Sequence, residues 1–274
     1  MSPSKKMSSW KLKQVGKAKV KNPILVEGLP GVGNVGKIAV DYLIDTIKAE
    51  KLYELSSHEI PHCVFVNEEN LIELPKISIY GKNINGRTLL FLAGDVQPIS
   101  ESSCFEFCNT ILDTFQKGRG KEIITLGGIG LPRIPKNPKV YCTGNSKKVV
   151  EKYKSRMVQT EIHGMIGPIV GVSGVLIGLA GRKNIPAITL LAETFGHPNY
   201  IGIKGARNIL KVLKKHLNLK IELSELDEEI NEIEGEIAKR VSKVEKVNKM
   251  IKNPQQQYLS LDTEEKEEER NYIG

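Results

Sequence analysis

The stretch PILVEGLPGVGNVG, Pro23–Gly36, predicts the seed of the fold. Its first part, Ile24–Val26, is a continuous apolar run, as expected of a strand that is covered on both faces. A turn rich in glycine and proline follows, and from Val35 to Ile47 apolar residues recur at helical spacing. A strand that leads through a tight turn into a helix is the first half of a βαβ unit, so we expect an α/β fold.

The same turn contains GVGNVG, which is formally a dinucleotide-binding fingerprint with glycines at Gly31, Gly33 and Gly36. Such glycines let the backbone approach a pyrophosphate, whose charge the free amides at a helix N-terminus stabilise. The fingerprint also requires an acid about 20 residues further on, and the acids after the strand expected at 63–66 come too late. We therefore favour a structural role for the glycines, and nucleotide binding is the alternative.

Two acids further along the chain could serve such a nucleotide site. Asp95 follows a strand expected at 88–93, and open α/β sheets bind ligands at the carboxyl ends of their strands. Glu193 follows a strand expected at 186–191 and, with His197, could act as acid and base or bind a nucleobase. No nucleophile or positioned partner can be named beside them. The sequence therefore favours a protein without catalysis or cofactor, and a nucleoside- or nucleotide-binding enzyme is the runner-up.

The remaining patterns predict a three-layer α/β sandwich with a mixed, mostly parallel sheet. Further strands are expected at 63–66, 76–80, 122–126 and 139–142, and helices at 35–50, 100–116, 147–156, 167–182 and 203–217. Asn85-Gly86 between two strands is a strong hairpin signal, so one pair is antiparallel. In the segment 167–182 glycines recur every three or four residues, which predicts a helix whose glycine face is pressed on the sheet.

Composition bounds the function classes. The chain has 40 Lys and Arg against 32 Asp and Glu, a net charge of +8. A basic chain of this kind makes nucleic acid a candidate partner. The lysines are scattered and few aromatic residues lie among them, so nucleic acid is disfavoured. The sequence contains no run of about 18 apolar residues, so no membrane span is expected. The cysteines Cys63, Cys104, Cys108 and Cys142 form no metal-binding pattern and, without a signal peptide, indicate a reducing, cytoplasmic setting.

A family resemblance rests on several segments of the chain. They are GLPGVGNVGKIAVDYLI (28–44), LAGDVQP (92–98), TLGGIG (125–130) and GPIVGVSGVLIGLAGRKNIPAITLLAET (167–194). Over roughly 22–217 the chain resembles the proteasome assembly chaperones, the archaeal homologues of the paired eukaryotic chaperones that help to build the proteasome α-ring. The resemblance implies a fold like that of nucleoside phosphorylases on a non-catalytic binding protein. It also implies proteasome α-subunits or the core particle as partners, and a homo-oligomer, alone or with a paralogous chaperone.

After the α/β domain, expected at 22–222, the pattern changes to that of a long helix. Apolar residues recur at sevenfold spacing, in one series at Leu226, Ile233 and Val247 and in another at Ile230, Ile237, Val244 and Ile251. About four such repeats predict a coiled-coil-like helix at 223–252, on the order of 40 Å long. We expect Ile230, Ile233, Ile237 and Val244 to contact a second subunit or a partner protein. The alternative is packing on the helix's own domain.

The two ends of the chain are expected to be flexible. The first 21 residues are basic and polar, and predict a mobile arm or an edge element docked through Trp10. The tail, 253–274, has six acids against two bases and ends in Tyr272, Ile273 and Gly274. Some members of the family that it resembles end in a hydrophobic–tyrosine–any motif that docks between proteasome α-subunits. Here tyrosine is third from last and Ile273 stands in its place, so docking of this tail is a hypothesis.

Overall fold

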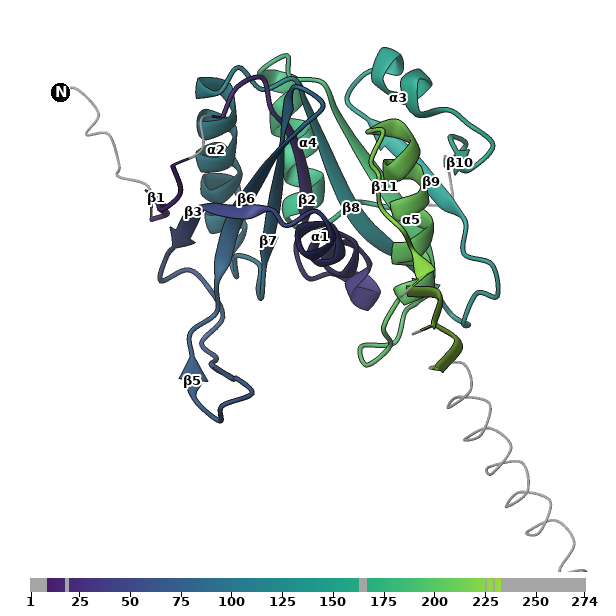
Figure 1. Ribbon diagram of the computed structural model, residues 1–274, viewed down its shortest axis with the longest axis horizontal. Coiled ribbons are helices and arrows are strands. Elements are labelled where there is room, and N and C mark those ends of the chain that lie inside the picture. The colour runs from purple at the N-terminus through teal and green to yellow at the C-terminus, as the bar shows by residue number, and fades with distance from the viewer. Residues whose placement is uncertain (1–8, 18–19, 163–166, 225, 229, 233–274) are drawn as a thin grey trace, which may run out of the picture. The chain divides into compact units, whose positions relative to one another are not determined.

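The computed structural model describes residues 9–17, 20–162 and 167–232, apart from 225 and 229 (Figure 1). The chain divides into two compact units, Met1–Ile221 and Glu222–Gly274. The first unit carries a single large sheet with helices, and the second is described only as helical turns between 224 and 232. The α/β fold predicted from the stretch around Gly28 is therefore confirmed, whereas most of the long C-terminal helix lies outside the described residues.

Within the described residues the main sheet has nine strands in the order β1-β3-β6-β7-β2-β8-β11-β9-β10. Their bounds are β1 Lys11–Gln14, β2 Ile24–Gly28, β3 Glu50–Ser56, β6 Ile77–Ile84, β7 Arg87–Gly94, β8 Glu122–Leu131, β9 Val140–Gly144, β10 Val158–Gln159 and β11 Ala187–Phe195. The central strands β7, β2, β8 and β11 run parallel. Antiparallel pairs join β1 to β3, β3 to β6, β6 to β7 and β11 to β9. The sheet is mixed, as predicted, and its parallel part lies at the centre.

Helices cover both faces of the sheet and make three layers (Figure 1). They are α1 Val35–Thr46, α2 Glu101–Lys117, α3 Lys147–Tyr153, α4 Val172–Arg182 and α5 Ile203–His216, with a 3-10 turn η1 at Val32–Asn34. Helices α2 and α4 pack together on one face, and α1 and α5 pack together on the other. Because alternate residues of a strand point to opposite faces, every residue of β2 is buried between the two helix layers.

Helix α1 approaches the sheet closely because two glycines leave room for it. A Cβ atom added at Gly28 would lie 2.2 Å from the carbonyl oxygen of Gly36. One added at Gly36 would lie 2.4 Å from the carbonyl oxygen of Leu126 on β8. Both distances are far below van der Waals contact, so neither position accommodates a side chain in this arrangement.

Part of the expected N-terminal arm belongs to the sheet. Strand β1 pairs antiparallel with β3 at the sheet edge. Beside it, Trp10 is buried, donates a hydrogen bond from its indole nitrogen to the Ser103 hydroxyl (2.9 Å), and meets the ring of Phe107 edge to face with centroids 4.7 Å apart. Of the two predictions for the N-terminal arm, residues 10–14 therefore fit the edge element that docks through Trp10.

Three expectations about local structure are wrong. The strand expected at 63–66 is not the strand that follows β2 in the main sheet. That strand is β3, in a segment to which the sequence pattern assigned no element beyond Glu50. Helix α1 ends at Thr46, and Lys48 turns the chain with a positive φ of 54° without the help of a glycine. The expected helix at 167–182 begins only at Val172, and its Gly178 faces open space. The helix instead buries Leu176 and Ala180.

Candidate functional site

The carboxyl ends of the central strands border a cavity of about 330 Å³. Its lining includes Gly31 and Val32 of the turn after β2, Gly127–Gly130 of β8, and Pro168–Val170. This is the edge at which open α/β sheets bind ligands. The glycine turn of the sequence therefore does lie beside a cavity, and the roles of its individual glycines decide what it can bind.

Two of the three fingerprint glycines are used for packing. Gly33 has a positive φ of 62°, and a Cβ there would lie 2.6 Å from the Thr194 hydroxyl oxygen. Its carbonyl oxygen accepts a hydrogen bond of 2.7 Å from the Gly202 amide. Gly36 is pressed against β8, as described above, and only Gly31 has free space around it. This geometry matches the favoured structural role of a tight turn and close helix-to-sheet packing.

The acids Asp95 and Glu193 are each engaged by neighbouring strands. Asp95 accepts a hydrogen bond from the Lys76 amide (2.9 Å). Glu193 accepts one from the Lys139 amide (2.9 Å) and one from the Tyr141 hydroxyl (3.0 Å). The pKa of Tyr141 is raised, first by burial of its hydroxyl and second by the neighbouring Glu193 carboxylate. In the part of the chain that the structure describes, no hydrogen bond or ion pair joins these acids to each other or to the glycine turn.

Glu27, which was not among the predicted site residues, is fully buried near the end of β2. Its carboxyl oxygens accept hydrogen bonds from the Leu29 amide (3.0 Å) and the Ser173 hydroxyl (2.9 Å), so it ties the glycine turn to the first turn of α4. Burial raises the pKa of Glu27 to about 7, although both hydrogen bonds oppose the shift. The signal was present in the sequence as one acid in an otherwise apolar strand, directly before the glycine turn.

A second feature is an apolar hairpin, residues 64–74, that stands apart from the main sheet (Figure 1). Its strands β4 (Phe65–Val66) and β5 (Ile72–Glu73) pair only with each other among the described strands. Its apolar side chains are 44–73% exposed, and they are Val64, Phe65, Val66, Leu71, Ile72 and Leu74. A concentration of exposed apolar side chains marks a surface for contact with another protein.

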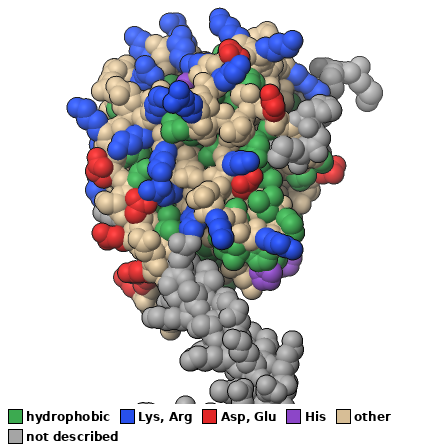
Figure 2. Space-filling view, turned by 90° about the vertical axis from the view of Figure 1, so that its right-hand side faces the viewer, with side chains coloured by type: hydrophobic (Ala, Val, Ile, Leu, Met, Phe, Trp, Pro, Cys, Tyr) green, Lys and Arg blue, Asp and Glu red, His purple; other side chains and the backbone are tan. Residues whose placement is uncertain are grey.

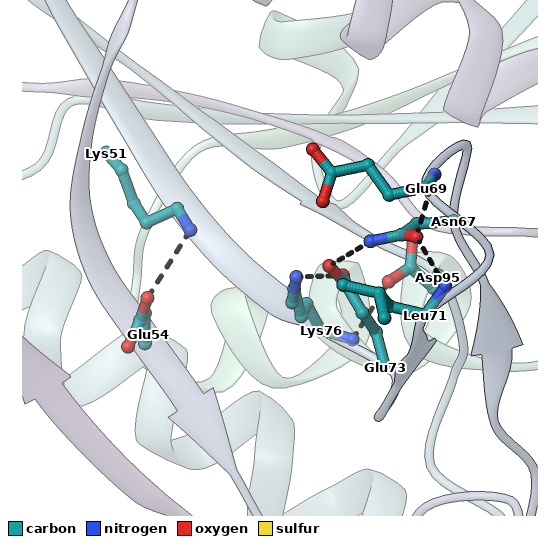
Figure 3. Close-up of polar contacts among 8 residues, drawn as sticks. All are labelled: Lys51, Glu54, Asn67, Glu69, Leu71, Glu73, Lys76 and Asp95. Carbon is teal, nitrogen blue, oxygen red and sulfur yellow. Dashed lines mark hydrogen bonds and ion pairs between the residues drawn. The ribbon is translucent and has the colours of Figure 1, made fainter.

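Polar contacts organise the turn of the apolar hairpin (Figure 3). The side-chain oxygen of Asn67 accepts hydrogen bonds from the amides of Glu69 (3.1 Å) and Leu71 (2.9 Å), and its side-chain nitrogen donates to Glu73 (3.0 Å). Glu73 also pairs with Lys76, and the hydrogen bonds from Lys76 and then Asn67 lower the pKa of Glu73. An isolated two-stranded hairpin is marginally stable in water. These contacts therefore hold the apolar hairpin in shape before any partner covers it.

Most of the residues predicted to bind a partner lie outside the described residues. They are Ile233, Ile237, Val244, Tyr272, Ile273 and Gly274. Ile230 is described, lies in a helical turn of the second unit, and is 8% exposed. The heptad pairing and the tail docking therefore stay predictions.

The described residues give little support for a metal centre. No group of three or more His, Cys, Asp or Glu side chains among them could hold a metal ion. Cys104, Cys108 and Cys142 are buried, whereas Cys63 is exposed just before the apolar hairpin. Burial raises the pKa of Cys142 to about 11. None of the described helices is long and apolar enough to span a membrane.

Comparisons with known proteins agree on one family. The model of the PAC2 family matches residues 25–241. The structure is similar to that of Pyrococcus furiosus PbaB, an archaeal proteasome activator, with a TM-score of 0.79 and 32% identity over 86% of this chain and 100% of that one. It is also similar to P. furiosus PbaA, an archaeal homologue of proteasome-assembly chaperone, with a TM-score of 0.72 and 26% identity over 91% and 98%. An uncharacterised protein of Methanocaldococcus jannaschii is 29% identical over 93% of both chains.

Proposed function

The chain belongs to the PAC2 family, and we propose that it is a non-catalytic chaperone that binds proteasome α-subunits and promotes assembly of the core particle. The relatives PbaB and PbaA, described as a proteasome activator and a homologue of proteasome-assembly chaperone, support a proteasome-related role. The observation on this chain that carries the proposal is the apolar hairpin, an exposed surface suited to joining copies of the chain, so that several tails and heptad helices could reach the proteasome together. Such a chaperone acts by mass action in the cytoplasm: it favours the assembled ring by binding the subunits that form it.

We assign the apolar hairpin to contact between copies of this chain. Permanent interfaces are more apolar than transient ones, and this surface combines six exposed apolar side chains with a turn that is already ordered. A homo-oligomer would display several C-terminal tails at once. Because linked binding sites raise the effective concentration for each further contact, tails that bind weakly one at a time would bind the α-ring together.

The tail and the heptad helix supply the proposed contacts with the proteasome. Tyr272 and Ile273 are the apolar anchors of the tail, and the terminal carboxylate of Gly274 is the group that a lysine of an α-subunit would pair with. The heptad residues Ile230, Ile233, Ile237 and Val244 would pair with a helix of a second subunit or a partner. Neither contact involves the glycine turn, to which the proposed function assigns no nucleotide.

Native mass spectrometry of this protein with proteasome α-subunits from the same source tests the proposal. The full chain and a chain cut after Arg270 are compared. We expect a complex with the full chain that the cut chain does not form. A complex with both would move the contact to the heptad helix or the globular unit. No complex with either, while both remain folded, would overturn the chaperone function.

The same instrument tests the assignment of the apolar hairpin. Ile72→Ser with Leu74→Ser removes two exposed apolar side chains without touching the contacts of Asn67. We expect the oligomer to dissociate into single chains. The control is Val15→Ser with Ile201→Ser, which removes two exposed aliphatic side chains elsewhere and should leave the mass of the assembly unchanged. Equal assembly in both variants would exclude the apolar hairpin as the interface.

A further inference from the structure

A hollow of about 600 Å³ lies at the amino-terminal edge of the parallel strands, the edge opposite to the glycine turn. The chain reaches this edge at the starts of β7, β2, β8 and β11, and α3 lies across it. The polar and charged residues of its lining are Asn22, Arg87, Lys121, Glu122, Ser146, Lys148 and Lys152. We call this hollow the basic pocket. Its charged residues come from three separate segments of the sequence, and only the fold brings them together.

The charges of the basic pocket do not balance. Four cations line it against one carboxylate, that of Glu122. Glu122 is 4% exposed, accepts a hydrogen bond from the Tyr153 hydroxyl (2.7 Å) and pairs with Lys152. That carboxylate is thereby satisfied, and Lys152 is the cation that it neutralises.

Three cations of the basic pocket are left over. The side chains of Arg87, Lys121 and Lys148 make no hydrogen bond or ion pair with the described part of the chain. Like charges that face one hollow repel one another, so an anion between them would relieve the repulsion. Figure 2 views the molecule from the side on which α3 and α5 lie, and Lys and Arg side chains gather over the upper part of this face.

A histidine lies beside Tyr153, the hydrogen-bond partner of Glu122 at the basic pocket. His216 of α5 stacks on the ring of Tyr153 with centroids 3.8 Å apart. Burial is the main cause that lowers the pKa of His216, and Lys152 and Arg87 lower it further, against the opposing effect of Glu122. Lys152 and Arg87 thus lie near enough to the imidazole to act on it, although the largest charge effect there is that of Glu122.

We propose that the basic pocket binds the phosphate chain of a ligand with two or more linked phosphate groups. Lysine binds phosphate as a point charge, and the planar fork of arginine matches two phosphate oxygens at once. Three unpaired cations around one hollow suit several linked anionic groups better than a single one. The volume is in the range of pockets that hold small molecules. This site is separate from the glycine turn, and it does not depend on the proposed proteasome function.

Isothermal titration calorimetry with inorganic tripolyphosphate, near physiological salt and without divalent metal, tests the proposal. The pocket variant is Lys121→Gln with Lys148→Gln, both exposed and unpaired. The control is Lys11→Gln with Lys13→Gln on β1, which removes the same charge from an exposed edge. We expect the pocket variant to bind about tenfold or more weakly than the natural chain, and the control to bind within about twofold of it.

Three results with tripolyphosphate, and one with ATP, would overturn the basic pocket as a phosphate site. One is no binding of tripolyphosphate by the natural chain, and another is equal weakening in both lysine variants, since that would reflect overall charge. The third is a polyglutamate peptide that competes as well as tripolyphosphate at equal charge, which would make the pocket a site for acidic protein segments. ATP serves as a further probe. If the pocket variant binds ATP more weakly than the natural chain does, as expected for tripolyphosphate, the result supports recognition of the phosphate chain. If the affinity for ATP is the same in both, the result contradicts it.

Discussion

Lys76 and Asp95 exchange two hydrogen bonds at the base of the apolar hairpin (Figure 3). The Lys76 amide donates to the Asp95 carboxylate at 2.9 Å, and the Asp95 amide donates to the Lys76 carbonyl oxygen at 2.9 Å. Lys76 directly precedes β6 and Asp95 directly follows β7, so the pair closes the β6–β7 ladder where the chain leaves for the apolar hairpin. An acid that the sequence offers to a nucleotide site is thus part of the framework.

Replacement of Asp95 should loosen this base. In Asp95→Ala the Lys76 amide loses its acceptor at an exposed position, which costs about 0.5–1.5 kcal/mol of unfolding free energy. Urea unfolding measures the loss, and hydrogen exchange should quicken at Lys76 and in the apolar hairpin. Asp95→Asn should lose less unfolding free energy, because it keeps a side-chain oxygen to accept from the Lys76 amide. It also removes the ion pair with Lys37, but that pair is long (3.9 Å) and partly exposed and so contributes little. An asparagine variant as unstable as the alanine variant would contradict this role.

The glycine motif should be sensitive at one end and tolerant at the other. Gly36→Ala places a methyl group 2.4 Å from a main-chain oxygen of β8, and the forced backbone shift should cost roughly 1–3 kcal/mol of unfolding free energy. Gly31→Ala has no atom within 4 Å of the new methyl group and keeps an extended φ of −161°. It should therefore unfold at the same temperature as the natural chain. Thermal unfolding of the two variants measures the contrast, and equal losses would refute it.

Stability should fall as the pH rises through the range set by Glu27. Its pKa is raised from 4.5 to about 7, so between these values the unfolded chain ionises this group while the folded chain keeps it protonated. The contribution of Glu27 is fully favourable below pH 4.5, and about 3 kcal/mol is lost by pH 7 to 8.

Glu27→Gln removes this titration while keeping an oxygen to accept from the Leu29 amide. We expect the variant to flatten the pH dependence of unfolding free energy between pH 4.5 and 7 and to be more stable than the natural chain at pH 8. Urea midpoints measured across that range are the readout. An unchanged pH profile would show that Glu27 is ionised in the folded protein.

The four cysteines should separate by reactivity. Cys63 is exposed, whereas Cys104, Cys108 and Cys142 are buried, and burial holds the pKa of Cys142 at about 11. A thiol reagent at pH 8 should therefore modify one site quickly, and mass analysis should locate it at Cys63. In denaturant all four should react. If self-association covers the apolar hairpin, the rate at Cys63 should also fall as protein concentration rises, and a constant rate would count against that interface.

Local signals in the sequence were sufficient for several elements. Asn85 and Gly86 both take positive φ, 51° and 77°, as the hairpin signal between β6 and β7 requires. The amide of Ser103 donates to the side chain of Ser100 at the start of α2, and serine is a residue type that favours this N-cap position. These features depend on a few adjacent residues, so a single sequence determines them.

Other features depend on distant partners and could not be predicted. The residues of β3 form a strand between β1 and β6, although the sequence pattern assigned none of them beyond Glu50 to an element. The apolar run at Phe65 has the composition of a buried strand but lies exposed. The basic pocket gathers Arg87, Lys121 and Lys148 from segments that are more than 20 residues apart in sequence. Composition predicted scattered lysines, and only the fold shows where they converge.

The position of Trp10 makes one edge of the sheet separately observable. It is the single tryptophan of the chain, and it lies beside the edge strand β1, against Phe107 of α2. Its fluorescence therefore reports the detachment of β1 from the body, whereas circular dichroism reports the sheet and helices as a whole. Where the two signals change at different denaturant concentrations, the N-terminal strand opens as a unit of its own, and its local opening free energy can be read without any label.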